Sequence, residues 1–423
     1  MPPLNSLLPP GPDSTSYPPS SGSLATAAPR RLPGSTRDPF LDLLRAGGTI
    51  AVIVAHWLMP QVSWDGNHLD VINVLDSGPG WLITWFIQVI PIMVFVAGAA
   101  CLTQMRARPT SWWRFMRARV SRILPPIAVF LGVWLVAAHA LPLLGAPASA
   151  VQVAATIAPQ LLWYMGIYVL LLLSAYALRA LYERYGLGFV AAVGGAGGLI
   201  DLLRFQAGFE TLAWANLFLV WAFAFLLGFA YADRKFENLS AKNTALAAFG
   251  GLAVLIAATL FGPYPASMVG MPGDPISNMG PPTLCIIALA VAQVFGSLTL
   301  RTVLIGATRG HRAQQAISWI SARSMTLYLW HLTAMFIVIG IVTVAYNVDL
   351  PQGWSLTWWL TRPLWFGACL FILLALVNVF EPIELRRGPI AQSVNRHKNR
   401  DQNGADQRTA ERPSLNVGNI QRH

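Results

Sequence analysis

An acid, a base and a histidine share one helical face near the start of this chain. They belong to the apolar stretch RDPFLDLLRAGGTIAVIVAHWLMP, residues 37–60. At about 100° per residue, Asp42, Arg45, Thr49 and His56 project from the same side of a helix, and that side is its only polar one. Ionisable groups inside a membrane span are costly and usually face a cavity or a partner. This face is therefore a candidate functional site.

His56 is the residue on this face that is suited to catalysis. A neutral imidazole can take a proton from a hydroxyl group and so activate that group as a nucleophile. Asp42 and Arg45 lie roughly 16–21 Å before His56 along the helix, so they can assist it only through a cavity or through other helices. The alternative is a packed histidine, and the residues alone leave the two interpretations even.

A run of arginines precedes a proline pair further along the chain. Arg119 and Arg122 are three residues apart, so they project side by side from one helical face. Guanidinium groups suit phosphates because each presents a planar fork of donors. The alternative, positive charge at the cytoplasmic membrane surface that contacts lipid head groups, is favoured when the residues are taken alone.

A second intramembrane histidine lies in ISWISARSMTLYLWHLTAMF, residues 317–336. Ser324, Tyr328 and His331 are three or four residues apart and therefore close on a helix. We expect them to support His56 or to bind substrate rather than to carry the catalysis. Trp163 is a further candidate for this support, although it opens an apolar segment with Tyr164, which is typical of an aromatic belt at the outer membrane surface.

The composition predicts an all-α, polytopic integral membrane protein. Of the 423 residues, 55% are hydrophobic and 11% are charged, whereas a soluble domain carries about 25% charged residues. A helix needs about 20 apolar residues to cross a bilayer. About ten transmembrane helices are expected, at 41–60, 81–103, 123–142, 161–178, 187–200, 212–232, 244–262, 282–300, 325–346 and 358–380.

The distribution of Lys and Arg predicts the orientation of these spans. Basic loops follow the second, fourth, sixth and eighth segments, and the loops between them carry almost no Lys or Arg. Positive charge marks the cytoplasmic side, so both termini are expected there. The fifth segment is short and rich in glycine, so it is expected to be tilted, broken or close-packed on a neighbour.

The remaining segments predict tails around a single membrane domain. Residues 1–36 and 386–423 have the composition of disordered cytoplasmic tails around the domain at 37–385. The outer loop at 263–281 is either a simple connection or the lining of a substrate mouth. We expect no metal site and no nucleic-acid binding. The three cysteines are expected to be packing residues.

These stretches together resemble the membrane acyltransferase family 3, the bacterial O-acyltransferases that modify surface sugars, lipids and secreted metabolites. The resemblance covers about residues 37–385. It rests on the order and spacing of five short motifs: Arg37, Asp42, Leu44, Arg45 and His56; Arg119, Arg122 and Pro125; Leu162, Trp163 and Tyr164; Phe225 to Gly228; and Ser324, Tyr328, Leu329, Trp330 and His331.

The resemblance implies an enzyme of the bacterial inner or plasma membrane that acts at the cell envelope. Acyl-CoA, most often acetyl-CoA, would be a co-substrate rather than a tightly bound cofactor, with its phosphates near Arg119 and Arg122. His56 would act as general base, or relay the acyl group, toward a hydroxyl of a sugar, lipid or metabolite. Asp42 and Arg45 would assist it. The alternatives are a multi-span transporter, since intramembrane His and Arg also mark transport paths, and a non-catalytic scaffold.

Overall fold

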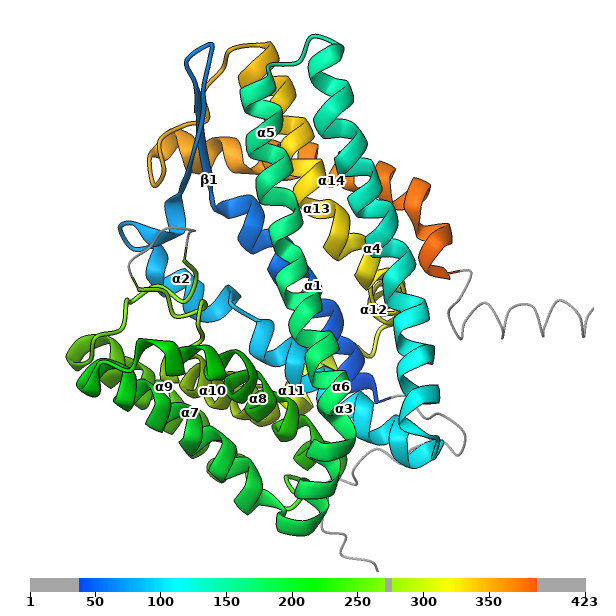
Figure 1. The fold of residues 1–423 in the computed structure, drawn as a ribbon, viewed down its shortest axis with the longest axis vertical. Helices are drawn as coiled ribbons and strands as arrows, with labels where there is room; N and C mark the ends of the chain where they lie inside the picture. The colour runs from blue at the N-terminus through cyan, green and yellow to red at the C-terminus, as the bar shows by residue number, and fades with distance from the viewer. Residues whose placement is uncertain (1–37, 271–275, 386–423) are drawn as a thin grey trace, which may run out of the picture. The chain divides into compact units, whose positions relative to one another are not determined.

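The computed structural model describes residues 38–270 and 276–385, which are mostly helical (Figure 1). The predicted tails at 1–36 and 386–423 lie outside the described residues. The first half contains α1 (Pro39–Leu58), α2 (Gly80–Ile87), α3 (Ile90–Ala107), α4 (Trp112–Leu143), α5 (Ala148–Ile157), α6 (Leu162–Tyr185) and α7 (Leu187–Ala207). The second contains α8 (Asn216–Ala232), α9 (Ala241–Phe261), α10 (Leu284–Thr299), α11 (Arg301–Ala307), α12 (His311–Ala322), α13 (Ser324–Ile339) and α14 (Leu356–Leu385).

The predicted fold class is confirmed. Within the described part of the chain, nine helical stretches are long and apolar enough to cross a bilayer. The pair α10 and α11 makes a tenth if it is one span, with a bend of 61° between the two helices. Each stretch corresponds to one of the ten predicted segments. The assignment of both termini to the cytoplasmic side stays a prediction.

Two segments differ from the expectation. The apolar helical stretch that contains the predicted fourth segment, 161–178, is longer, because α5 and the short turn η2 (Ala158–Leu161) extend it to Ala148–Tyr185. Tyr164 is buried inside the domain rather than in an outer aromatic belt. The expected basic loop after the eighth segment is also largely helical. It forms α11 and α12, and α12 packs against α1.

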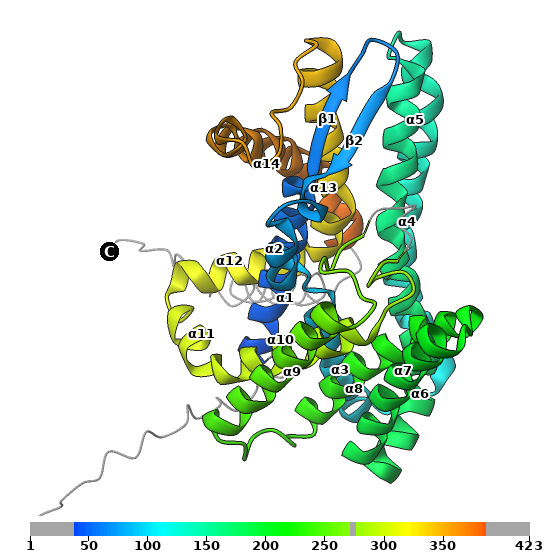
Figure 2. The ribbon, with the colours of Figure 1, turned by 90° about the vertical axis from the view of Figure 1, so that its left-hand side faces the viewer.

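A hairpin that the sequence did not predict follows α1. Strand β1 (Pro60–Trp64) pairs antiparallel with β2 (Leu69–Asn73), with Pro60 opposite Asn73, and Figure 2 shows this ribbon beside α5. Pro60 is the first residue of its strand, a position where its missing N–H costs no ladder bond. The chain then continues through η1 (Val74–Asp76) into α2.

Glycines allow several helices to approach closely. A Cβ atom on Gly98 of α3 would lie 2.0 Å from the Phe225 carbonyl oxygen, and one on Gly228 of α8 would lie 2.1 Å from the Phe95 carbonyl oxygen. The contact is therefore reciprocal and admits only glycine on both helices. In α7, a Cβ on Gly197 would likewise lie 2.8 Å from Ile287 of α10. The glycine-rich fifth segment is thus an unbroken helix that is close-packed on its neighbours, as small residues permit in membrane domains.

The second span is interrupted between α2 and α3, and neighbouring groups satisfy its free polar atoms. Gln293 of α10 donates to the backbone carbonyls of Trp85 (3.2 Å) and Gln88 (2.9 Å). The Gln88 side chain donates to the Met268 carbonyl at 3.1 Å. Such substitute bonds allow a helix to break at membrane depth. The described part of the 263–281 loop therefore packs on α2, and whether it also lines a substrate path stays open.

Candidate active site

His56 lies in the last turn of α1 and is half-buried. Its Nδ1 is 2.8 Å from the carbonyl oxygen of Val52, one turn earlier. A carbonyl can only accept, so Nδ1 carries the proton of the neutral ring and Nε2 keeps its lone pair. His56 therefore presents a basic nitrogen at the end of the helix, and no described residue hydrogen-bonds to that nitrogen.

His331 lies in the middle of α13 and is completely buried. Its Nδ1 is 2.6 Å from the Tyr328 carbonyl oxygen, which selects the same tautomer as in His56. Its Nε2 is buried without a hydrogen-bond partner among the described residues. A buried polar atom in this state is uncommon in folded proteins. His331 therefore also has an unused lone pair.

The two histidines come together although they are far apart in the sequence. Their ring centroids are 4.8 Å apart, with an interplanar angle of 65°. Helices α1 and α13, which carry them, lie side by side (Figure 1). Two neutral rings that both keep a lone pair on Nε2 cannot hydrogen-bond to each other through these atoms. The sequence predicted both residues, and the structure joins them into one His56–His331 pair.

Aromatic rings continue from the pair toward α6. Tyr328 and His331 have ring centroids 5.9 Å apart, and Tyr328 and Tyr164 5.6 Å apart. The Tyr328 hydroxyl donates to the Leu161 carbonyl at 2.5 Å, which fixes the ring. Trp163 contacts Tyr164 and is 41% exposed. Of the predicted supporting residues, Tyr328 therefore touches the histidine pair and Trp163 lies two rings away from it.

Ser324 does not reach the pair. It is the first residue of α13, so it lies about 10 Å before His331 along the helix. Its proposed support of His56 could only be indirect.

Asp42 and Arg45 form a site of their own at the other end of α1. Arg45 Nη1 lies 3.6 Å from Asp42 Oδ1, and both side chains are partly exposed. Thr49 donates to the Arg45 carbonyl at 2.9 Å, one turn closer to the middle of the helix. Asp42 and Arg45 lie near the N-terminus of α1, several turns before His56 as the sequence predicted, and do not contact it. Arg37, the first residue of the family motif that includes Asp42 and Arg45, lies outside the described residues.

Arg119 and Arg122 both lie on α4 but differ in their surroundings. Arg119 is half-buried, donates to the Tyr168 hydroxyl at 3.1 Å and also bonds Gln104 of α3. Arg122 is exposed. Neither has a carboxylate partner among the described residues, whereas nearby Arg106 is paired with Asp233 at 2.8 Å. The two guanidiniums therefore keep their charge available, and their role in cofactor binding stays a prediction.

One residue of this region was missed in the sequence. Arg362 of α14 is buried, and its Nη1 donates at 3.4 Å to the carbonyl of Trp57, the neighbour of His56. It lies inside the predicted span at 358–380, so the rule that drew attention to Arg45, an ionisable group within a span, could have found it.

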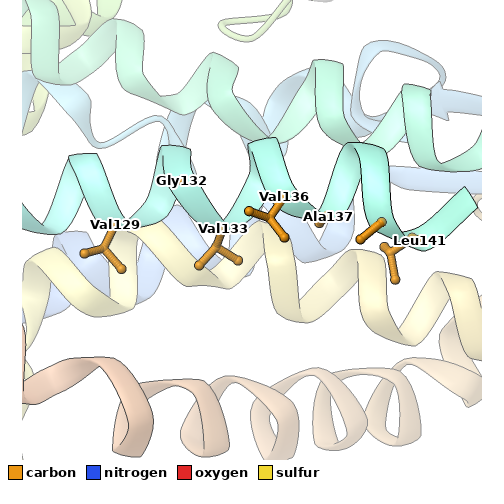
Figure 3. Close-up of a pocket in the computed structure, with 7 residues that line it drawn as sticks. Val129, Gly132, Val133, Val136, Ala137 and Leu141 are labelled. Atoms are coloured by element: carbon orange, nitrogen blue, oxygen red, sulfur yellow. The ribbon is translucent and has the colours of Figure 1, made fainter. Parts of the chain in front are cut away.

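A groove along α4 and the distribution of metal-binding side chains complete the description of the domain. Within residues 38–270 and 276–385, no group of three or more His, Cys, Asp or Glu side chains is arranged to hold a metal ion. An apolar groove of about 520 Å³ follows α4, where Val129, Val133 and Val136 point toward a neighbouring helix (Figure 3). Its lining has no titratable group, so this groove offers no catalytic chemistry.

Comparison with known proteins supports an acyltransferase. The profile of the acyltransferase domain, acyltransferase family 3, matches residues 38–382. This range includes all ten predicted spans and both histidines. No curated protein and no solved structure is significantly similar to the chain. Because the match covers far more than half of the sequence, the chain belongs to acyltransferase family 3.

Proposed function

We propose that the protein transfers an acyl group, in the first instance acetyl, from cytoplasmic acyl-CoA to a hydroxyl group at the outer side of a bacterial inner membrane. The acceptor would be a carbohydrate, a lipid or a secreted metabolite. The observation that carries this proposal is the His56–His331 pair. It places two imidazole lone pairs, neither hydrogen-bonded to a described residue, inside a membrane domain of an acyltransferase family.

His56 is the proposed general base because its side chain is partly exposed, whereas His331 is sealed. Nε2 of His56 takes the hydroxyl proton of the acceptor while the acceptor oxygen attacks the thioester carbonyl carbon. A C–O bond forms, the C–S bond breaks, and the proton passes to the departing CoA thiolate. The free Nε2 of His331 stabilises the transient positive charge on His56, since it can accept a hydrogen bond from the protonated ring.

The proposed donor site lies on the arginines of α4. Arg119 and Arg122 have no carboxylate partner among the described residues, so they can bind the phosphates of CoA. Arg45 lies roughly 16 Å before His56 on α1, on the side predicted to be cytoplasmic. We assign it to holding the donor or to stabilising developing charge.

The test is acetyl-CoA consumption by the purified protein with a panel of sugar and lipid acceptors, measured as release of the CoA thiol. We expect turnover by the wild type. The double variant Arg119→Gln/Arg122→Gln should raise the KM for acetyl-CoA about tenfold with a smaller change in kcat. The control Arg234→Gln alters an exposed arginine that is paired with Glu237 and should leave KM unchanged.

A wild type that neither binds nor consumes acetyl-CoA would contradict the proposal. Solute flux into vesicles that is independent of acyl-CoA would then support the transporter alternative. Unchanged kinetics in the arginine double variant would remove the donor site from α4 while leaving the role of the histidines intact.

A further inference from the structure

Trp57 connects the two histidines through the backbone. It follows His56 directly, is 3% exposed, and donates from Nε1 to the backbone carbonyl of His331 at 3.0 Å. That carbonyl lies inside α13, where carbonyls already accept helical hydrogen bonds. The indole N–H of Trp57 therefore gives the backbone carbonyl oxygen of His331 a second hydrogen bond.

The carbonyl of Trp57 is itself held by α14. It is among the last four of α1, which lack partners within the helix. Trp365 Nε1 donates to it at 2.8 Å, and Arg362 Nη1 at 3.4 Å. A cation at the C-terminus of a helix is also stabilised by the helix dipole. The guanidinium of Arg362 lies over the Trp358 ring, 4.2 Å from its centroid, so the capping group is held in place in turn.

The same residue thus fixes three helices at the level of the histidine pair. Helix α1 ends at Trp57, α13 is attached through its indole, and α14 through its carbonyl. Ring packing alone would hold Trp57 in the core, since its ring also contacts Phe366 with centroids 5.8 Å apart. Packing does not require the N–H to face the carbonyl of His331 in particular.

We propose that Trp57 is the positioning residue of the catalytic pair. Its two hydrogen-bonded groups set the separation of the His56 and His331 rings and keep His331 sealed from water. This inference rests on the proposed function only for its effect on turnover. Its effect on the accessibility of His331 is independent of any activity.

The test compares Trp57→Phe with Trp134→Phe. The first keeps an aromatic ring and loses the N–H. The second removes a similar buried bond, from Trp134 Nε1 to Thr333 Oγ1 at 3.1 Å, which joins α4 to the same helix α13. We expect Trp57→Phe to lower kcat about tenfold with the KM for acetyl-CoA within about twofold, because small misplacement of a catalytic group is costly. Trp134→Phe should retain the wild-type kcat.

A second measurement does not depend on turnover. Diethyl pyrocarbonate modifies histidine at an accessible imidazole nitrogen, and mass spectrometry reads its extent at His56 and His331 separately. Of these two histidines, only His56 should react in the wild type. In Trp57→Phe the reaction at His331 should rise about fivefold or more, and in Trp134→Phe it should not.

The outcomes separate the two proposals. Unchanged modification of His331 in Trp57→Phe, or an equal rise in Trp134→Phe, overturns the positioning role. An inactive wild type with the expected modification pattern overturns the enzyme function and leaves the positioning role intact. If Trp57→Phe does not fold, Trp365→Phe decides, since it removes one bond to the Trp57 carbonyl and is expected to raise modification of His331 as well.

Discussion

Helix α13 has two regions that treat buried polar groups in opposite ways. In its first turn, Glu384 of α14 accepts hydrogen bonds from Met325 N (3.2 Å), Thr326 N (2.8 Å) and Thr326 Oγ1 (2.5 Å). Arg323, just before the helix, forms an ion pair with Glu381. Further along the same helix, His331 has a buried Nε2 with no partner among the described residues.

The difference distinguishes structural from functional polarity inside one element. The first four N–H groups of a helix lack internal partners, and a carboxylate that accepts from them also complements the helix dipole. The Met325 and Thr326 donors in the first turn are therefore hydrogen-bonded to Glu384, and these bonds join α13 to α14. The His331 Nε2 makes no hydrogen bond to any described residue, and its ring lies beside that of His56. The contact with a second histidine is what marks His331 as a candidate for chemistry.

The largest expected effect comes from removing the two lone pairs. An asparagine at either histidine position keeps a donor near the place of Nδ1 and loses Nε2. We expect His56→Asn to lower kcat about 10³-fold and His331→Asn about 10²-fold, which is the range for a proton-transfer group. The free energy of unfolding in an SDS titration should change by no more than about 1 kcal/mol.

The opposite result for His331→Asn would show that His331 and the first turn of α13 serve the same structural role. If His331→Asn retained turnover but lost several kcal/mol of stability, the histidine would be a structural group like Glu384.

A change at the first turn of α13 should have the opposite signature. Met325 N donates to one oxygen of Glu384, and Thr326 N and Oγ1 donate to the other. Glu384→Gln keeps the size of the side chain but replaces one of these oxygens by an NH₂ group, which cannot accept a hydrogen bond. We expect a loss of about 2 kcal/mol of stability, because buried donors then lack acceptors. The kcat of the folded fraction should stay within about threefold of the wild type. The control Glu237→Gln alters an exposed carboxylate and should be neutral.

Much of this arrangement could be predicted from the sequence. Long apolar runs fixed the number and place of the spans because a lipid environment admits little else than helices. His56, Tyr328 and His331 were predicted because polar side chains at helical spacing in an apolar run are conspicuous. These signals are local, and each is visible within a few turns of one helix.

The parts that could not be predicted depend on contacts between distant segments. The meeting of His56 with His331, and the attachment of Trp57 to α13 and α14, require knowledge of which helices are neighbours. The hairpin at 60–73 was not predicted, because its two strands are only five residues each and carry polar side chains typical of a connection between spans. The burial of Tyr164 could not be predicted either, because it depends on packing between α6 and distant parts of the chain.

A smaller effect is expected from the ion pair at the start of α13. Arg323→Lys keeps the charge but loses the two-nitrogen contact with Glu381. It also weakens the packing of the guanidinium over the Trp319 ring, 4.7 Å from its centroid. We expect a loss of about 1 kcal/mol, measured by the same titration. Arg234→Lys, at an exposed pair with Glu237, should change stability by less than about 0.5 kcal/mol.

The smallest effect should come from Asp233, just after α8, and it should depend on pH. Burial disfavours the charged form of Asp233, but the hydrogen bond and charge of Arg106 outweigh it and lower its pKa, with Lys235 contributing. A carboxyl group whose pKa is lowered by folding stabilises the protein above the pKa of the unfolded chain, about 3.9. This contribution disappears as the pH falls through the lower folded value. Asp233→Asn should therefore cost about 0.5 kcal/mol at pH 7.

The difference between the wild type and Asp233→Asn should shrink steadily below about pH 4, as measured by unfolding at a series of pH values. A difference that stayed constant down to pH 3 would mean that the side chain acts through its shape rather than its charge. Asp233 would then no longer belong with the paired ionic groups, and the contrast with the unpaired histidines would rest on α13 alone. A difference that follows the titration of the carboxyl group would show that the ionic groups at the end of α8, like those at the start of α13, stabilise the fold. The contrast with the histidine pair would then hold at two helix ends.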